Sequence, residues 1–386
     1  MIRSFRIKNF KSLDLSAPLQ FGKGLNVLIG LNGSGKSTLL QALSFVSSLG
    51  LYGGCGAWLD RRGWVDKDLT CALRFPGITV RRSVIEFEMS AGQAEDIFDW
   101  SGIYNTQSRR CTEEELRGHS PEMSLSVKNG RLTGKGILLP DNMLKLLVYE
   151  GSVLSALKLP AIQAAQQALF SCYSLELLSP HLMRGRIRRA ISTGVGGGGE
   201  QIAHYLKHIS PEKRQRLEDI MRRFYPGYES YAVSTMRGGA LRFSVQEKFA
   251  EGGSLSSDAK QICDGMLRVL AITAQSLECE GKTLLIDEPE DGINPELLER
   301  LVAYLRDEAP CQTIITTHQP LVLSCLTDDE ARQGVYLVTK NDRGSSDCVR
   351  FFDLPTPRDM LKSYYPGEVM LRCNLEEVSR EAQTAA

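Results

Sequence analysis

The sequence predicts an α/β fold with a central, mostly parallel sheet, an antiparallel β lobe and an inserted helical subdomain. The first observation is a glycine-rich stretch at 30–38, between a buried strand at 25–29 and a helical pattern that begins at Thr38. The second is a pair of apolar segments, 283–286 and 312–317, each followed by polar side chains. The third is strand-like alternation within 50–135. Buried strands around a phosphate-binding loop fit all three observations.

The composition is that of an ordinary globular chain. Of the 386 residues, 42% are hydrophobic and 24% charged, and 46 basic residues balance 46 acidic ones. This balance does not indicate a nucleic-acid partner, although a local basic face stays open. Ten cysteines occur without a C-x-x-C pair, which argues against a zinc ribbon. No secretory leader opens the chain and no apolar run reaches membrane-spanning length, so we expect a cytoplasmic protein with reduced thiols and no membrane contact.

The chain opens with a half-buried strand. Residues 5–8 alternate between apolar and polar side chains, and the segment leads into the strand before the glycine-rich stretch. Lys11 follows this first strand. It is either a solvated surface lysine or a group that approaches a bound phosphate compound.

The glycine-rich stretch has the P-loop spacing, in which Gly30 and four further residues precede Gly35-Lys36-Ser37. Glycines let several peptide N–H groups point at one anion, and the helix that follows adds positive partial charge. Lys36 is expected to reach the terminal phosphates of ATP, and the Ser37 hydroxyl to bind Mg²⁺. The predicted ATP-binding residues are Asn32, Gly33, Ser34, Gly35, Lys36, Ser37 and Thr38.

Residues 50–135 predict an antiparallel sheet. The segment 84–89 alternates, and Asn129-Gly130 lies between two strand-like runs, which is a strong hairpin signal. The turn 60–63 is either a surface loop or a segment that reaches the nucleotide.

The stretch from about 143 to 225 has leucines at helical spacings, including Leu144, Leu146 and Leu147. Basic clusters at 184–189, 213–216 and 222–223 either grip a phosphate backbone or form a solvated helical face. The glycine run 194–199 lacks a following lysine and is expected to be a flexible loop. We expect an insertion here, so the predicted parts are an N-terminal lobe at 1–142, a helical insertion at 143–228 and a C-terminal lobe at 229–386.

The segment 283–286 is a buried strand that ends in Asp287 and Glu288. Asp287 is expected to help hold Mg²⁺, and Glu288 to polarise the attacking water as a catalytic base. Asn294 followed by Pro295 has the pattern of a helix N-cap.

A further buried strand, 312–317, ends at His318, which by itself is as well explained by a structural role. Two terminal strands, 335–338 and 349–352, are expected to complete the sheet, and 376–386 to form a frayed or helical tail.

The opening 5–13, the P-loop, Asp264-Gly265 and the acidic strand together resemble the RecF, SMC and OLD-type branch of the ABC ATPase class. The resemblance covers 1–50 and 255–340 strongly, and is greatest to compact bacterial ATPases related to the OLD family. It implies an ABC-type core in which Cys263, Asp264 and Gly265 form a signature that faces the ATP of a second protomer. Cys263 departs from the serine usual there, and a thiol is a poor donor. It also implies that Asp291 and Asn294 meet the partner, and that His318 and Lys36 act with Glu288 in catalysis.

The function that this resemblance implies is Mg²⁺-dependent ATP hydrolysis by a homodimer or higher homo-oligomer. Members of the group often occur with a separate nuclease or other toxic effector in antiphage systems, so an effector protein is an expected partner. The alternatives are a RecF-like ATPase that binds DNA through the basic face at 184–223, and a scaffold that binds ATP without hydrolysing it.

Overall fold

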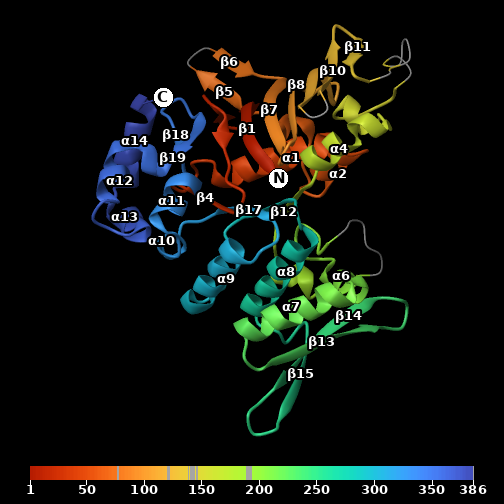
Figure 1. The fold of residues 1–386 in the computed structure, drawn as a ribbon, viewed down its shortest axis with the longest axis vertical. Helices are drawn as coiled ribbons and strands as arrows, with labels where there is room; N and C mark the ends of the chain where they lie inside the picture. Colours follow the sequence, from red (N-terminus) through yellow and green to blue (C-terminus); the bar gives the residue numbers. More distant parts are fainter. Residues whose placement is uncertain are drawn as a thin grey trace.

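The computed structural model describes residues 1–75, 78–119, 122–137, 139, 144, 147–187 and 194–385. Leu146, the boundary predicted at 142/143, and Arg188 and Arg189 of the first basic cluster lie outside the described residues. Figure 1 shows an antiparallel lobe, a block of C-terminal helices and a lower helical part around one large sheet.

The large sheet has the strand order β11-β10-β9-β8-β7-β1-β2-β19-β18-β4-β17-β16-β12, with β3 paired to β1. From β18 to β12 neighbouring strands are parallel, and from β11 to β1 they are antiparallel. Its strands are β1 Ile2–Phe10, β2 Leu13–Asp14, β3 Leu19–Gln20, β4 Leu25–Ile29, β7 Val84–Gln93, β8 Asp96–Asn105, β9 Arg110–His119, β10 Glu122–Lys128, β11 Arg131–Lys135, β12 Cys172–Leu175, β16 Thr283–Ile286, β17 Gln312–Thr316, β18 Val335–Lys340 and β19 Ser346–Arg350.

The central strands are buried because both of their faces are covered. Along β4, Val27 and Ile29 belong to one hydrophobic core while Leu28 belongs to the other. In β16, Leu285 likewise faces the opposite core from Leu284. This is the pattern expected of buried parallel strands, and it leaves only their ends free to carry polar groups.

Helices cover the sheet on both sides. Helix α1 packs on β12, β16 and β17, α4 packs on β7 and β8, and α14 packs on β18. The helices are α1 Lys36–Leu49, α2 Gly54–Asp60, α4 Pro160–Leu169, α5 Pro180–Met183, α6 Ile202–His208, α7 Pro211–Phe224, α8 Asp264–Glu278, α9 Pro295–Asp307, α10 Pro320–Ser324, α11 Asp328–Gly334, α12 Pro355–Met360, α13 Pro366–Arg372 and α14 Leu375–Ala385, with 3₁₀ turns η1 Asp66–Leu69, η2 Val153–Ser155 and η3 Phe351–Asp353. Among the residues described, no helix has the length and apolar character needed to span a membrane.

The hairpin predicted at Asn129-Gly130 is confirmed. These two residues join β10 to β11 with φ of 50° and 69°, the left-handed pair that a two-residue turn of this kind requires. A separate small hairpin pairs β5 Ala72–Phe75 with β6 Ile78–Arg81.

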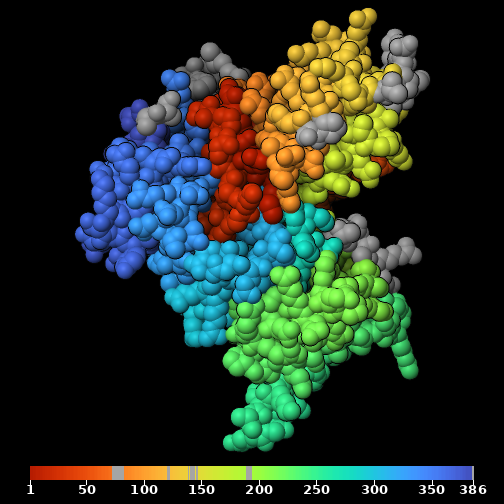
Figure 2. All heavy atoms as spheres, in the orientation of Figure 1, coloured from red at the N-terminus to blue at the C-terminus, as the bar shows by residue number. Residues whose placement is uncertain are grey.

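Within the helical insertion predicted at 143–228, one strand that the sequence did not indicate, β12, joins the large sheet as a parallel neighbour of β16. Four residues are too few to show a period of two, and their strand conformation depends on pairing with β16. Nor did the sequence indicate the antiparallel sheet of β13 Tyr228–Thr235, β14 Leu241–Lys248 and β15 Ser254–Asp258. In Figure 2 the tip between β14 and β15 forms the lowest part of the molecule.

The chain ends much as expected, since β18 and β19 complete the sheet and the tail is helix α14. The second strand stops at Arg350, however, and Phe351 and Phe352 turn into η3, where both rings are buried.

Candidate functional site

The predicted phosphate loop connects β4 to α1 and needs glycine at two positions. Gly30 has φ of 149°, and a Cβ there would lie 2.4 Å from the carbonyl oxygen of Val338. Gly35 has φ of 113°, and a Cβ there would lie 2.9 Å from Ser346 Oγ. Residues of β18 and β19 therefore pack closely against the loop. Helix α1 begins directly after the loop, at Lys36.

The other predicted loop residues occupy different depths. Asn32 and Gly33 are exposed at the crest, Ser34 is buried, and Ser37 and Thr38 are partly buried at the start of α1. Such a helix N-terminus presents free peptide N–H groups and is a ready site for an anionic group.

The side chain of Lys36 turns back into the loop. Its Nζ donates hydrogen bonds to the carbonyl oxygens of Gly30, at 3.0 Å, and Leu31, at 3.4 Å. Burial lowers the pKa of Lys36, while the carboxylates of Glu288, Asp287 and Glu290 oppose that effect. The ammonium group is therefore held beside the loop with three acidic groups in its field.

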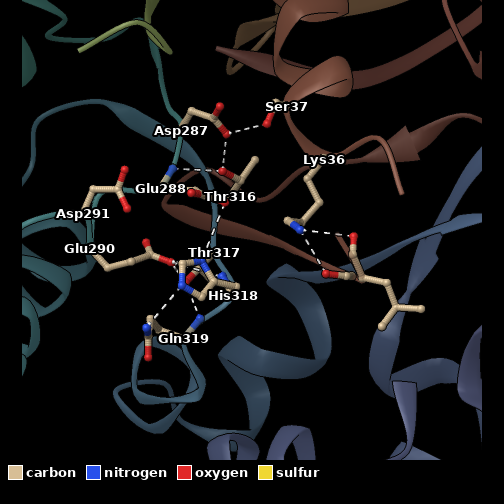
Figure 3. Close-up of polar contacts among 12 residues, drawn as sticks. Lys36, Ser37, Asp287, Glu288, Glu290, Asp291, Thr316, Thr317, His318 and Gln319 are labelled. Atoms are coloured by element: carbon tan, nitrogen blue, oxygen red, sulfur yellow. Dashed lines mark hydrogen bonds and ion pairs between the residues drawn. The ribbon is translucent and has the colours of Figure 1, made fainter. Parts of the chain in front are cut away.

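Ser37 and Asp287 meet across the sheet edge. Ser37 Oγ donates a hydrogen bond of 3.0 Å to Asp287 Oδ1, although the two residues lie on different elements, α1 and the end of β16 (Figure 3). A hydroxyl and a carboxylate are hard oxygen ligands, and Mg²⁺ in phosphate sites takes few protein ligands because substrate oxygens and water supply the rest. The two side chains predicted to bind Mg²⁺ therefore suit that ion in chemistry and in proximity.

Glu288 has a strained backbone that Thr316 supports. Its φ is +45°, which is unusual for a residue with a side chain. Its backbone N–H donates a hydrogen bond of 3.0 Å to Thr316 Oγ1, and the Thr316 hydroxyl in turn donates to Asp287 Oδ1. One hydroxyl at the end of β17 thus fixes both acidic residues that follow β16. The sequence analysis did not single out Thr316.

His318 follows the same strand, β17, and contacts two carboxylates. Its Nδ1 lies 3.3 Å from Glu290 Oε1 and 3.6 Å from Glu288 Oε1. Glu290 also accepts hydrogen bonds from Thr317 Oγ1, at 2.6 Å, and from the backbone N–H of His318, at 3.1 Å. The structure therefore brings together Glu288 and His318, two of the predicted catalytic residues. It adds Glu290, to which the sequence analysis gave no role.

The predicted signature lies at the start of α8, apart from the phosphate loop. Cys263 is the exposed N-cap residue, and Asp264 forms an ion pair with Arg184. A Cβ at Gly265 would lie 3.0 Å from the carbonyl oxygen of Gly292, so the signature packs against the loop that holds Asp291. Among the described residues, no hydrogen bond or ion pair links 263–265 to Lys36 or Ser37.

Asn294 caps helix α9. Its side chain accepts a hydrogen bond of 2.8 Å from the backbone N–H of Leu297, with Pro295 at the first helical position. Capping accounts for Asn294 within the chain, and contact with a partner stays a prediction. Asp291 lies 3.8 Å from Arg268 of α8, a half-exposed contact of small energetic weight.

Two basic side chains near α1 have partners. Lys11 Nζ donates a hydrogen bond of 2.8 Å to Gln41 and lies 3.5 Å from the centre of the Trp64 ring. Burial lowers the pKa of Lys11 to about 8. Arg62 in the turn 60–63 is buried in an ion pair with Glu176, so the surface-loop interpretation of that turn is wrong for Arg62.

Five side chains of the three basic clusters are paired with carboxylates in the described residues. The ion pairs are Arg184–Asp264, Lys213–Glu278, Arg214–Glu218, Arg222–Asp219 and Arg223–Glu308. A face that binds DNA needs cations free for phosphates, so the pairing in the clusters 213–216 and 222–223 favours a solvated helical face there.

Two family models match separate parts of the chain. One, described as "AAA domain, putative AbiEii toxin, Type IV TA system", matches residues 181–324, and one described as "AAA domain" matches residues 4–132. A stretch of 47 residues is 38% identical to the Structural maintenance of chromosomes protein 3 homolog of Plasmodium falciparum (isolate 3D7). This stretch is 12% of the present chain and only 4% of that relative.

Solved structures share the fold over most of the chain. An SMC head bound to the C-winged helix domain of ScpA matches with a TM-score of 0.53 at 15% identity, covering 90% of this chain and 97% of that one. An Smc head with an extended coiled coil, bound to the C-terminal domain of ScpA and derived from Pyrococcus furiosus, also has a TM-score of 0.53, at 14% identity, covering 94% and 99%. The chain therefore has the mixed α/β fold of SMC heads, as the predicted ABC-type core required.

Proposed function

We propose that this chain is an ATPase that binds Mg²⁺ and ATP at the edge of the sheet and converts ATP and water to ADP and phosphate. The observation that carries the proposal is one chain of hydrogen bonds from Ser37 through Asp287 and Thr316 to the backbone of Glu288. It joins the helix after the phosphate loop to the ends of β16 and β17. Both AAA-domain matches and the SMC-head fold support the same function class.

In this proposal each side chain has one task. Peptide N–H groups of 32–38 and the ammonium group of Lys36 bind the phosphates. Ser37 and Asp287 hold Mg²⁺, which when bound neutralises charge on the phosphate oxygens. Glu288 polarises the attacking water, and His318 contacts the terminal phosphate.

The proposed assembly is a homodimer or higher homo-oligomer in which Cys263, Asp264 and Gly265 of one copy meet ATP held by another. Exposure of Cys263 at the N-terminus of the 15-residue helix α8 supports this, because that end can approach an anion on a partner. The proposed role is control of a separate effector such as a nuclease in antiphage defence. The family description that names a toxin and a type IV TA system supports a role of this kind.

The test is ATP hydrolysis by the purified chain, combined with its solution mass with and without ATP in a Glu288→Gln variant. We expect turnover to fall at least about a hundredfold in Glu288→Gln, since a positioned general base contributes that much. ATP binding should persist and the mass should rise with ATP. Lys36→Ala should lose ATP binding, and normal binding by that variant would contradict the phosphate-loop assignment.

A non-hydrolysing scaffold gives a different result in the same experiment. Wild-type turnover would equal that of Glu288→Gln, and the solution mass would not change with ATP. Cys263→Ser would then be the first variant to test for recovery of turnover. A DNA-binding ATPase has less support, because five basic side chains of the face predicted at 184–223 are paired with carboxylates.

A further inference from the structure

Glu290 is a buried carboxylate, and its burial is not explained by a gain in the stability of the fold. Its side chain is 4% exposed, against 35% for Glu288. Burying a carboxylate is unfavourable unless hydrogen bonds and charges compensate for the water that it loses. Here one oxygen, Oε1, accepts every hydrogen bond recorded for the carboxylate, while Oε2 is buried and has no partner among the described residues. Burial accordingly raises the pKa of Glu290.

The Glu290 carboxylate contacts His318 twice and the preceding residue, Thr317, once. Oε1 accepts from the hydroxyl of Thr317 and from the backbone N–H of His318, which fixes the peptide that carries the imidazole. The same oxygen lies 3.3 Å from Nδ1 of the ring. Figure 3 shows Glu290 reaching the imidazole from the loop after β16, while Thr317 and His318 come from the end of β17.

The two ring nitrogens of His318 therefore have different environments. Nδ1 faces the carboxylates of Glu290 and Glu288, which favour a proton on that nitrogen. Among the residues that the structure describes, Nε2 has only the amide group of Gln319 as a partner, at 3.3 Å, and the ring is 45% exposed. A carboxylate that accepts from one ring nitrogen sets the tautomer and the orientation of the other, as it does for histidines that bind metals.

We propose that Glu290 is a positioning residue that acts through His318, holding the imidazole as the Nδ1–H tautomer with Nε2 free for the terminal phosphate or the attacking water. The proposal rests on the ATPase function only for the role of Nε2. The Glu290–His318 pair itself is a property of the chain and can be measured without turnover.

The kinetic test is Glu290→Gln, which keeps the volume and an oxygen acceptor for Thr317 and the peptide of His318 but removes the charge beside Nδ1. We expect kcat to fall about tenfold, the lower end for loss of a histidine's carboxylate partner, with KM for ATP unchanged. In a His318→Gln background the same substitution should change kcat less than about twofold, because its route of action is gone. Independent, multiplying losses in the double variant would overturn the proposal, as would full activity of Glu290→Gln.

The matched control is Glu296→Gln, at a 77% exposed position on α9. It should leave kcat unchanged. Thermal unfolding of all variants separates loss of fold from loss of positioning, because Glu290→Gln should unfold no earlier than wild type.

The second measurement is the tautomer of His318 by NMR of ¹⁵N-labelled histidine. The chain has five histidines, and the His318 signal is the one lost in His318→Gln. We expect Nδ1 to be protonated and Nε2 unprotonated in the wild type, and a mixture of tautomers in Glu290→Gln. An unchanged tautomer would refute the pairing. If the wild type shows no turnover, the ATPase function fails, and this measurement alone then decides whether Glu290 orients His318.

Discussion

At the scale of single residues, the hydroxyl of Thr316 holds two acidic groups in place. It accepts a hydrogen bond from the strained backbone of Glu288 and donates one to the carboxylate of Asp287. For a residue other than glycine, such as Glu288, a positive φ costs on the order of 1–3 kcal/mol of folding free energy. It persists only where the surrounding structure enforces it. Thr316 supplies part of that enforcement from the neighbouring strand.

Thr316→Val tests this support, because valine keeps the shape and removes the hydroxyl. A hydrogen bond to a charged group contributes about 1.5–3 kcal/mol, so we expect ATP turnover to fall about tenfold or more. The control is Thr313→Val on the same buried strand, where the hydroxyl has only a 3.8 Å contact to Cys311 Sγ. Equal turnover in both variants would show that Glu288 keeps its geometry without Thr316.

The residues that sequence could identify are those whose task follows from the local chain. Ser37 and Asp287 each lie at a fixed offset from a buried strand, so strand-end geometry brings them to one edge. The roles of Thr316 and Glu290 were not predicted, because they depend on contacts between the ends of neighbouring strands. A local sequence pattern does not contain such contacts. A third acidic residue directly after Asp287-Glu288-Pro289 was the one signal available for Glu290.

At the scale of elements, β9 carries a fully buried acid. Glu114 faces the core between apolar neighbours and accepts hydrogen bonds from Ser152 Oγ, the backbone of Val153 and Trp100 Nε1. Burial, the largest effect, raises its pKa from 4.5 to about 7, against the opposing hydrogen bonds. The folded chain therefore binds this proton more tightly than the unfolded chain does.

This raised pKa predicts the sign of a pH effect on stability. The contribution of Glu114 is fully present below about pH 4.5 and is lost as the pH rises through about 7. Between pH 4 and 8, wild type should lose on the order of 3 kcal/mol of unfolding free energy relative to Glu114→Gln, measured by urea titration. The control is Glu115→Gln, on the other face of β9. Its curve of unfolding free energy against pH should run parallel to that of wild type. Parallel curves for Glu114→Gln as well would mean that the carboxyl does not titrate in this range.

At this scale, the elements that could be predicted are those with a local sequence signal of their own. The buried strands β4, β16 and β17 and the Asn129-Gly130 turn were predicted because each satisfies a local rule. The four residues of β12 were missed, since only the register against β16 makes them a strand. The sheet of β13–β15 was missed, although Leu241, Phe243 and Val245 alternate with polar residues along β14 as in a half-buried strand.

At the scale of the whole molecule, no hydrogen bond or ion pair among the described residues joins the two halves of the proposed site. Asp287 contacts Ser37 and His318 contacts Glu288 within one chain, whereas Cys263 is exposed at the start of α8. A catalytic site completed by a second copy accounts for both facts. The neutral net charge of the chain is compatible with close approach of two copies.

Cys263→Trp in the Glu288→Gln background tests this arrangement, because it places a bulky ring on the exposed end of α8 without touching the phosphate loop. We expect the ATP-dependent rise in solution mass to disappear while the affinity for ATP measured at low protein concentration stays within about twofold. Tryptophan at exposed Glu377 on α14 should leave the mass change intact. If the Cys263 variant still associates with ATP, the copies meet through another face, and the signature segment has no part in completing the site. If it loses ATP binding as well, the α8 end supports the nucleotide of its own chain, which would contradict a site shared between copies.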